Sequence, residues 1–231
     1  MARYYPIALD LTGRRCLVVG GGHEALAKTR GLLEAGARVH AISPTFLPEF
    51  DGLAEPDRLT LSRRRYRAED LQGVALAFGC AEDEETHRAL VEDARRLGVL
   101  LNVVDQPHRC DFILPAVLRQ GSLTVAITTD GKSPALASWL REQLSARLGS
   151  EVGEFLDVLG ALRPVVKASV PDRSRRATLF SRLVRSRALE RLQAGDRDGM
   201  YAELSAILKE YDVPCPREWS TWSAPDPGPR T

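Results

Sequence analysis

The sequence predicts an α/β fold: a doubly wound parallel sheet in the N-terminal half, a short segment of mixed strand and helix, and a helical C-terminal region. Three observations support this prediction. Short apolar runs alternate with amphipathic helical patterns over residues 1–112. The first of these runs leads directly into three glycines and a helical pattern. From about residue 150 onward, nearly every segment has helical periodicity.

The N-terminal elements are predicted from the chain in order. Buried parallel strands read as short continuous apolar runs, whereas helices place apolar residues three and four positions apart. On these criteria we expect strands at 15–20, 37–43, 59–66, 74–80 and 99–105. We expect helices at 23–36, where Gly36 ends the pattern, and at 83–98.

The pattern changes after residue 112. Two β-rich runs joined by a turn at 119–122 precede a helix over 132–149, where Ser133 suits the N-cap and Pro134 the first turn. Helical segments follow at 152–169, 175–195 and 198–211, and we expect the Pro-, Ser- and Gly-rich tail to be poorly ordered. The predicted parts are therefore 1–112, 113–148, 149–212 and the tail, 213–231.

Composition excludes several classes of protein. Lys and Arg number 32 against 31 Asp and Glu, which gives no overall charge that would favour nucleic acid or a membrane surface. No apolar run approaches the length of a membrane span, and the first residues lack the pattern of a secretory signal. The four cysteines form no CxxC pair, so neither a disulfide framework nor a zinc site is indicated, and we expect a cytoplasmic protein.

The glycine turn predicts a dinucleotide site. Gly20, Gly22 and Ala25 match G-x-G-x-x-A between a predicted strand and a predicted helix. The first glycine permits the tight turn, the second lets the backbone approach a pyrophosphate, and the small third residue lets helix and strand pack closely. The N–H groups at the start of the helix then face the phosphates.

The second strand leaves the choice between NAD and NADP open. A carboxylate about 20 residues after the glycines usually binds the adenosine ribose. Here the strand ends with Ser43-Pro44-Thr45, so the nearest polar candidates are Ser43 and Thr45. Arg38 and His40 are alternatives for a 2′-phosphate, but solvated side chains near the start of a strand are the preferred explanation for both.

Four segments then resemble the siroheme synthase family, whose members are precorrin-2 dehydrogenases and in some cases also sirohydrochlorin ferrochelatases. The segments are "YPIALDLTGRRCLVVGGG", "LLEAGARVHAISPTFLPEF", "NVVDQPHRCDFILPA" and "VAITTDGKSPALASWLREQL". The resemblance implies a Rossmann-type domain and oxidation of precorrin-2 to sirohydrochlorin by NAD. It further implies Fe²⁺ as the substrate of a second step that yields siroheme. We expect a stand-alone form, without the methyltransferase domain that fused members carry.

The resemblance also assigns roles to residues. The functional aspartate of the family falls on Asp105, at the end of a predicted strand, where a carboxylate suits proton transfer. A turn-capping aspartate is the structural alternative. Contacts to NAD map onto the glycine turn, the next two residues and the loop after the second strand: Gly20, Gly21, Gly22, His23, Glu24, Pro44 and Thr45. Lys132 and Ser133 fall near the expected substrate cleft, although Ser133 also suits a purely structural cap.

Partners follow from the same resemblance. The family forms a homodimer, which we expect through 113–148. The stretch 163–197 has many more Arg and Lys than Asp and Glu. A solvated helical face is the default explanation. The functional explanation is that basic side chains steer a polycarboxylate tetrapyrrole, and the candidates are Arg163, Arg175, Arg176 and Arg182. We expect no nucleic-acid partner, because no recognised binding motif is present.

Some positions depart from the family pattern. His23-Glu24, Ala27, Ala81-Glu82 and Asp130 replace residues that the family usually carries. These departures motivate an alternative function, a dinucleotide- or tetrapyrrole-binding relative without turnover. The short motif His108-x-Cys110-Asp111 lacks the spacing of a metal site, and we assign no metal ligands.

Overall fold

The computed structural model describes residues 4–53 and 57–215. The chain forms two compact units, which we treat separately. Of the described residues, those up to 114 and 130–132 make up the first unit, and 115–129 and 133–215 make up the second. Within the described residues, no helix is both long and apolar enough to cross a membrane.

The first unit is a parallel five-stranded sheet in the order β3-β2-β1-β4-β5. The strands are β1 (Arg15–Val19), β2 (Arg38–Ile42), β3 (Leu59–Ser62), β4 (Leu76–Gly79) and β5 (Leu100–Val103). This order confirms the predicted doubly wound fold, and the chain reverses direction across the sheet between β1 and β4. In open α/β sheets, ligands bind outside the carboxyl ends of the strands at this switch point.

Side chains of alternate residues on the strands build two cores, one on each face of the sheet. Cys16 and Val18 of β1 pack with α1 (His23–Glu34), whereas Leu17 and Val19 pack with α2 (Glu84–Leu97). The two helices therefore cover opposite faces. Asp83 caps α2 by accepting a hydrogen bond from the Thr86 N–H, and Gly98 ends this helix in the left-handed region.

Two short 3₁₀ turns shape the connections of this unit, and a third follows the last strand. They are η1 (Pro48–Phe50), η2 (Ala68–Leu71) and η3 (Pro107–Arg109). We predicted the third strand to continue to residue 66, but β3 ends at Ser62. The reason is that the next residues leave the sheet, where Arg64 turns to an ion pair with Asp70 of η2.

The second unit begins with an antiparallel hairpin, β6 (Ala116–Gln120) and β7 (Leu123–Ile127), packed by α3 (Pro134–Ser145). Gly121 occupies the left-handed region in the two-residue turn, as hairpin turns of this length require. Ser133 caps α3 by accepting a hydrogen bond from the Leu136 N–H, and Pro134 occupies the first turn. Both features of this helix start were predicted.

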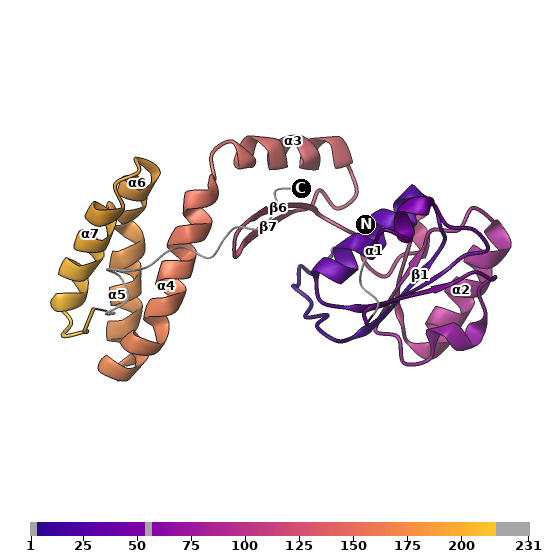
Figure 1. Cartoon of the computed structure of the whole chain (residues 1–231), viewed down its shortest axis with the longest axis horizontal. Helices are drawn as coiled ribbons and strands as arrows, with labels where there is room; N and C mark the ends of the chain where they lie inside the picture. Colours follow the sequence, from indigo (N-terminus) through magenta and orange to yellow (C-terminus); the bar gives the residue numbers. More distant parts are fainter. Residues whose placement is uncertain (1–3, 54–56, 216–231) are drawn as a thin grey trace. The chain divides into compact units, whose positions relative to one another are not determined.

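Four further helices complete this unit around one core (Figure 1). They are α4 (Ser150–Ser169), α5 (Arg173–Arg185), α6 (Ala188–Gln193) and α7 (Arg197–Lys209). Our prediction of a continuous helical segment over 175–195 was wrong, because Ser186 is extended and its hydroxyl bonds the Leu183 carbonyl and the Ala188 N–H. Val213, in the predicted tail, is buried in this core, whereas residues 216–231 lie outside the described residues.

Candidate dinucleotide site

The register of the sheet places the ends of its strands along one edge. Val19 pairs with Ile42 and with Gly79, and Gly79 pairs with Val103. The residues that follow each strand therefore emerge side by side. These are the glycine turn after β1, Ser43 after β2, Cys80 after β4 and the turn containing Asp105 after β5.

A cleft of about 660 Å³ opens at this edge around the switch point. Its walls are the glycine turn, the loop at 43–48, the pair Arg65-Tyr66, the segment 80–83, and residues 85–86 at the start of α2. The cleft brings together six of the predicted cofactor contacts, which are Gly20, Gly21, Gly22, Ser43, Pro44 and Thr45. These six predicted contacts thus line the same cleft.

The three glycines meet different steric demands. Gly20 has φ 138°, and a Cβ there would overlap the carbonyl oxygen of Cys80. A Cβ on Gly21 would overlap the carbonyl oxygen of Thr45 and lie 2.8 Å from the Ser43 hydroxyl. A Cβ on Gly22 would meet no protein atom within 4 Å. Gly22 is therefore free of packing constraints, and its missing side chain leaves open space beside the helix start.

The start of α1 is open to an anion. Gly22 occupies the N-cap, and no side chain caps the helix. The helical hydrogen bonds begin with Leu26, whose N–H donates to the Gly22 carbonyl at 3.0 Å. The N–H groups of the preceding first-turn residues are those that bind phosphate oxygens at helix N-termini. The residues at the turn thus fit a dinucleotide pyrophosphate.

Two predicted cofactor contacts lie outside the cleft lining. His23 and Glu24 are exposed in the first turn of α1, and the Glu24 carboxylate pairs with Lys28 at 3.1 Å. Among the departures from the family pattern, by contrast, Ala81 and Glu82 do line the cleft. The changes after β4 thus lie on the cleft wall, whereas the change after the glycines does not.

Charge in the cleft is unevenly distributed. Among the described residues that line the cleft, Glu82, Asp83 and Glu85 are acidic and follow β4, and Arg65 is the one basic residue. Hydrogen bonds from Thr86 hold the pKa of Asp83 below its ordinary value, and nearby Arg65 lowers it further. Burial raises the pKa of the Cys80 thiol to about 12, so this thiol stays protonated at neutral pH.

Arg38 and His40 do not reach the cleft. Arg38 is the first residue of β2, at the end of the strand away from the glycine turn. His40 is half-buried within the sheet, where its Nε2 lies 2.8 Å from the Ser62 hydroxyl. Burial lowers the pKa of His40. The explanation as a solvated side chain fits the exposed Arg38, but it is wrong for His40, which packs within the sheet.

Asp105 is exposed in a tight turn after β5, on the same edge of the sheet as the cleft. Its φ of 59° is in the left-handed region, which aspartate tolerates better than most residues. The turn is held by the N–H of Val104, which donates to Gly79, and by the side chain of Gln106, 3.0 Å from Nδ1 of the buried His87.

The residues after Asp105 have structural roles. The Cys110 thiol donates to the Val103 carbonyl at 3.3 Å and accepts a hydrogen bond from the Val103 N–H. The Asp111 carboxylate accepts from the Leu101 N–H at 2.9 Å. These contacts tie the segment after η3 back onto β5. Cys110 and Asp111 thereby fix the end of the strand that carries Asp105.

The remaining predicted residues belong to the loop before α3 and to the helices of the second unit. The backbone of Ser133 exchanges two hydrogen bonds with the Thr129 hydroxyl, each 3.1 Å long, and Lys132 directly precedes it. The candidate arginines of the helices contact their own unit: Arg163 lies over Phe180, Arg175 and Arg182 over Tyr211, and Arg176 donates to the carbonyls of Val170 and Pro171.

Arg65 and Tyr66, which enter the cleft from the loop after β3, were not predicted from the sequence. The steric role of Gly21 was not predicted either. The available signal was positional, because residues that follow parallel strands share one edge of the sheet.

Three family models match consecutive parts of the chain. The model described as putative NAD(P)-binding matches residues 7–116. The sirohaem biosynthesis protein central region matches 120–147, and the sirohaem synthase dimerisation region matches 151–208. The description of dimerisation thus falls on the helices, whereas we had expected dimerisation through 113–148.

Siroheme synthases are among the most similar relatives. That of Nitrosomonas europaea is 34% identical over 207 residues, which are 89% of this chain and 44% of the relative. Siroheme synthase 2 of Aeromonas hydrophila is 37% identical over 175 residues, 74% of this chain and 37% of the relative. The chain thus spans less than half the length of these curated relatives.

A solved structure shares the fold. The protein named SirC, precorrin-2 dehydrogenase, superposes with a TM-score of 0.71 at 24% identity, over 90% of this chain and 99% of that one. The three consecutive family matches and the siroheme synthase relatives show that the chain belongs to the siroheme synthase family, in the part that carries the NAD(P)-binding, central and dimerisation regions.

Proposed function

We propose that this chain catalyses the NAD-dependent oxidation of precorrin-2 to sirohydrochlorin in siroheme biosynthesis. The observation that carries the proposal is the arrangement at one edge of one sheet, where an open glycine turn, a cleft and Asp105 occur together. The names of the relatives supply the substrate class, since they are siroheme synthases and the structural neighbour is a precorrin-2 dehydrogenase.

The cleft residues have separate tasks in this proposal. The first-turn N–H groups of α1 and the bare backbone of Gly22 hold the pyrophosphate, while Gly20 and Gly21 keep the turn close to the loops behind it. Pro44 and Thr45 line the side of the adenosine, next to the nearly buried Ser43. When bound, NAD supplies the hydride acceptor. The exposed His23 and Glu24 flank the phosphates without lining the cleft.

Asp105 is the proposed proton acceptor. Loss of a hydride from the reduced macrocycle leaves a cation that must release a proton, and an exposed carboxylate on the ligand-binding edge can take it. The hydrogen bonds of Gln106 and Val104 hold the turn in place without engaging the Asp105 carboxylate. Lys132 and Ser133 remain candidates for contacts to the substrate carboxylates.

Two further parts of the proposal rest on the relatives. Insertion of Fe²⁺ into sirohydrochlorin is proposed as a second activity, because the relatives are named siroheme synthases. Asp105 would then help remove the pyrrole protons. A homodimer is proposed because the sirohaem synthase dimerisation region matches 151–208.

The test is an anaerobic assay of the purified chain with precorrin-2 and NAD⁺, following NADH and the sirohydrochlorin spectrum. We expect NADH formation by the wild type and a loss of roughly 100-fold or more in Asp105→Asn. Asparagine also tolerates the left-handed turn, so the variant should fold normally. The matched control is Asp212→Asn, since Asp212 has a similar φ of 57° but lies in the helical unit.

The outcomes separate the candidate functions. Equal rates for Asp105→Asn and the wild type would refute the role of Asp105. A chain that binds NAD⁺ and precorrin-2 but forms no NADH would instead support the non-catalytic binding function. Iron insertion is tested separately with sirohydrochlorin and Fe²⁺, and a rate no higher than the uncatalysed one would exclude that activity.

A further inference from the structure

The adenosine side of the cleft lacks the feature that favours NAD over NADP. A carboxylate at the end of the second strand normally binds the 2′-hydroxyl of the ribose and repels a 2′-phosphate. Here that position is Ser43, which is 8% exposed, and the next residues are Pro44 and Thr45. The cleft carboxylates lie instead in the loop after β4 and at the start of α2, on Glu82, Asp83 and Glu85.

Four arginines occur in the loop after β3, and three of them have anionic partners. Arg63 pairs with Asp51 at 3.1 Å and lies over the Phe46 ring. Arg64 forms a bidentate pair with Asp70, at 2.7 and 2.8 Å. The third, Arg67, approaches Glu69 at 3.8 Å.

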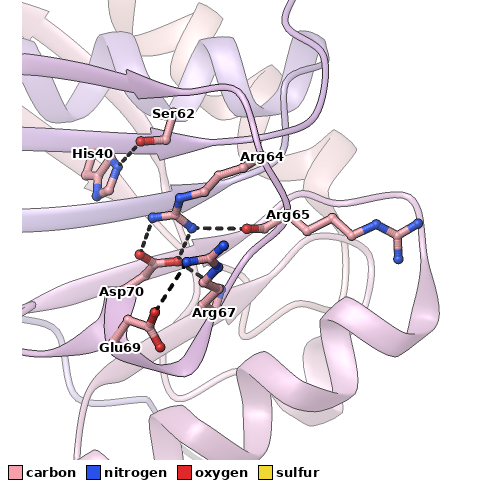
Figure 2. A network of polar contacts seen from close by, with 7 residues as sticks. All are labelled: His40, Ser62, Arg64, Arg65, Arg67, Glu69 and Asp70. Carbon is pink, nitrogen blue, oxygen red and sulfur yellow. Dashed lines mark hydrogen bonds and ion pairs between the residues drawn. The ribbon is translucent and has the colours of Figure 1, made fainter.

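The fourth arginine, Arg65, faces the cleft. Its side chain is exposed, and it lines the cleft together with Tyr66. Within the part of the chain that the structure describes, the Arg65 guanidinium forms no ion pair. Figure 2 shows this side chain extending away from the network that holds its neighbours. Arg65 is therefore a cation available to an incoming ligand.

The backbone around Arg65 is held from both sides. The Arg64 guanidinium donates to the Arg65 carbonyl at 3.0 Å and is itself fixed by Asp70 (Figure 2). The Tyr66 hydroxyl donates to Asp93 of α2 at 3.0 Å. Asp70 is 7% exposed and also accepts a hydrogen bond from the Arg67 N–H. A cation on a braced loop loses less entropy on binding than one on a mobile loop.

We propose that Arg65 binds the 2′-phosphate of an adenosine, so that this cleft accepts NADP⁺ in addition to NAD⁺. The inference rests on the proposed function, because it assigns the adenosine to the wall formed by the loops after β2 and β3. A guanidinium suits this ligand, since it can donate two parallel hydrogen bonds to one phosphate. The nearby carboxylate of Asp83 accepts a hydrogen bond from the Thr86 N–H and forms no ion pair with Arg65 among the described residues, so the guanidinium donors of Arg65 stay available to a phosphate.

The test measures binding of NAD⁺ and NADP⁺ to the full chain by calorimetry, at low and at moderate salt. Arg65→Ala is the test variant. Arg67→Ala is the matched control, because Arg67 lies in the same loop, is exposed and does not line the cleft. The fragments 2′,5′-ADP and 5′-AMP isolate the contribution of the 2′-phosphate. A thermal melt of each variant verifies folding.

We expect wild-type chain to bind both dinucleotides. Arg65→Ala should lower the affinity for NADP⁺ and for 2′,5′-ADP by about 10- to 100-fold, which is the effect of losing a hydrogen bond to a charged group. The affinity for NAD⁺ should change by less than about threefold. The Arg67→Ala variant should bind both dinucleotides like the wild type. The affinity for NADP⁺ should also fall more steeply with salt than that for NAD⁺.

Three outcomes would overturn the inference. Binding of NAD⁺ without NADP⁺ would refute it while leaving the proposed function intact. If Arg65→Ala lowers the affinity for NAD⁺ and NADP⁺ equally, Arg65 contacts a part that the two dinucleotides share, such as the adenine ring, and not the 2′-phosphate. Failure of the wild type to bind either dinucleotide would refute the inference and the proposed function together.

Discussion

Substitutions at neighbouring glycines of the turn are predicted to have different effects: Gly21→Ala should lower stability, and Gly22→Ala should lower the affinity for the dinucleotide. In Gly21→Ala, the new Cβ would overlap the Thr45 carbonyl oxygen and lie 2.8 Å from the Ser43 hydroxyl. The Leu47 N–H also donates to the Gly21 carbonyl at 2.9 Å, so the loop cannot move away without losing this bond. Overpacking of this kind costs about 1–3 kcal/mol.

In Gly22→Ala, by contrast, the Cβ would enter open space. Alanine is a poorer N-cap than glycine, but it also reduces the entropy of the unfolded chain, and the two effects offset each other to within about 1 kcal/mol. The same Cβ would occupy the space through which a pyrophosphate approaches the backbone. We therefore expect a nearly unchanged stability and a dinucleotide affinity at least about tenfold lower.

Thermal melts and NAD⁺ titrations of both variants provide the assay. At roughly 4 °C per kcal/mol for a unit of this size, Gly21→Ala should lower the melting temperature by about 4–12 °C. Gly22→Ala should melt within about 4 °C of the wild type. The reasoning is refuted if Gly21→Ala melts like the wild type, or if Gly22→Ala binds NAD⁺ with unchanged affinity.

Three further predictions concern the rest of the chain. Asp70→Asn should destabilise the first unit by about 1–3 kcal/mol in urea unfolding, because it weakens the pair with Arg64. Burial alone would raise the pKa of Asp70, but hydrogen bonds from Arg64 and Arg67 hold this pKa below its ordinary value of 3.8. The stabilisation by the ionised Asp70 is therefore complete above about pH 4 and is lost as the pH falls further. An equal acid sensitivity of the variant and the wild type would contradict this. Gly153→Ala should lower the free energy of unfolding by about 1–3 kcal/mol, because the new Cβ would overlap the carbonyl of Gln120. If this variant melts at the wild-type temperature, α4 can move away from the hairpin. Sedimentation should show a dimer at micromolar concentrations, and a monomer throughout this range would refute the proposed homodimer.

The sequence by itself predicted the parallel sheet, the hairpin and the helical region. Local signals suffice for these elements: apolar runs specify buried strands, and Asp83, Ser133, Gly36 and Gly98 mark helix ends through hydrogen bonds and conformations that depend on near neighbours. The glycine turn was also predictable, because its meaning follows from its place between a strand and a helix. The break at Ser186 was not predicted, since a single serine is compatible with a helix.

Only the tertiary structure decided which residues form the cleft. Arg65 and Tyr66 join it because β3 ends at Ser62 and Arg64 turns to Asp70, a contact between side chains on different elements. Gly21 is constrained by Thr45, which lies 24 positions away along the chain but directly behind the turn. Such contacts depend on which strands lie side by side, and hydrophobic periodicity carries no information about distances across the sheet.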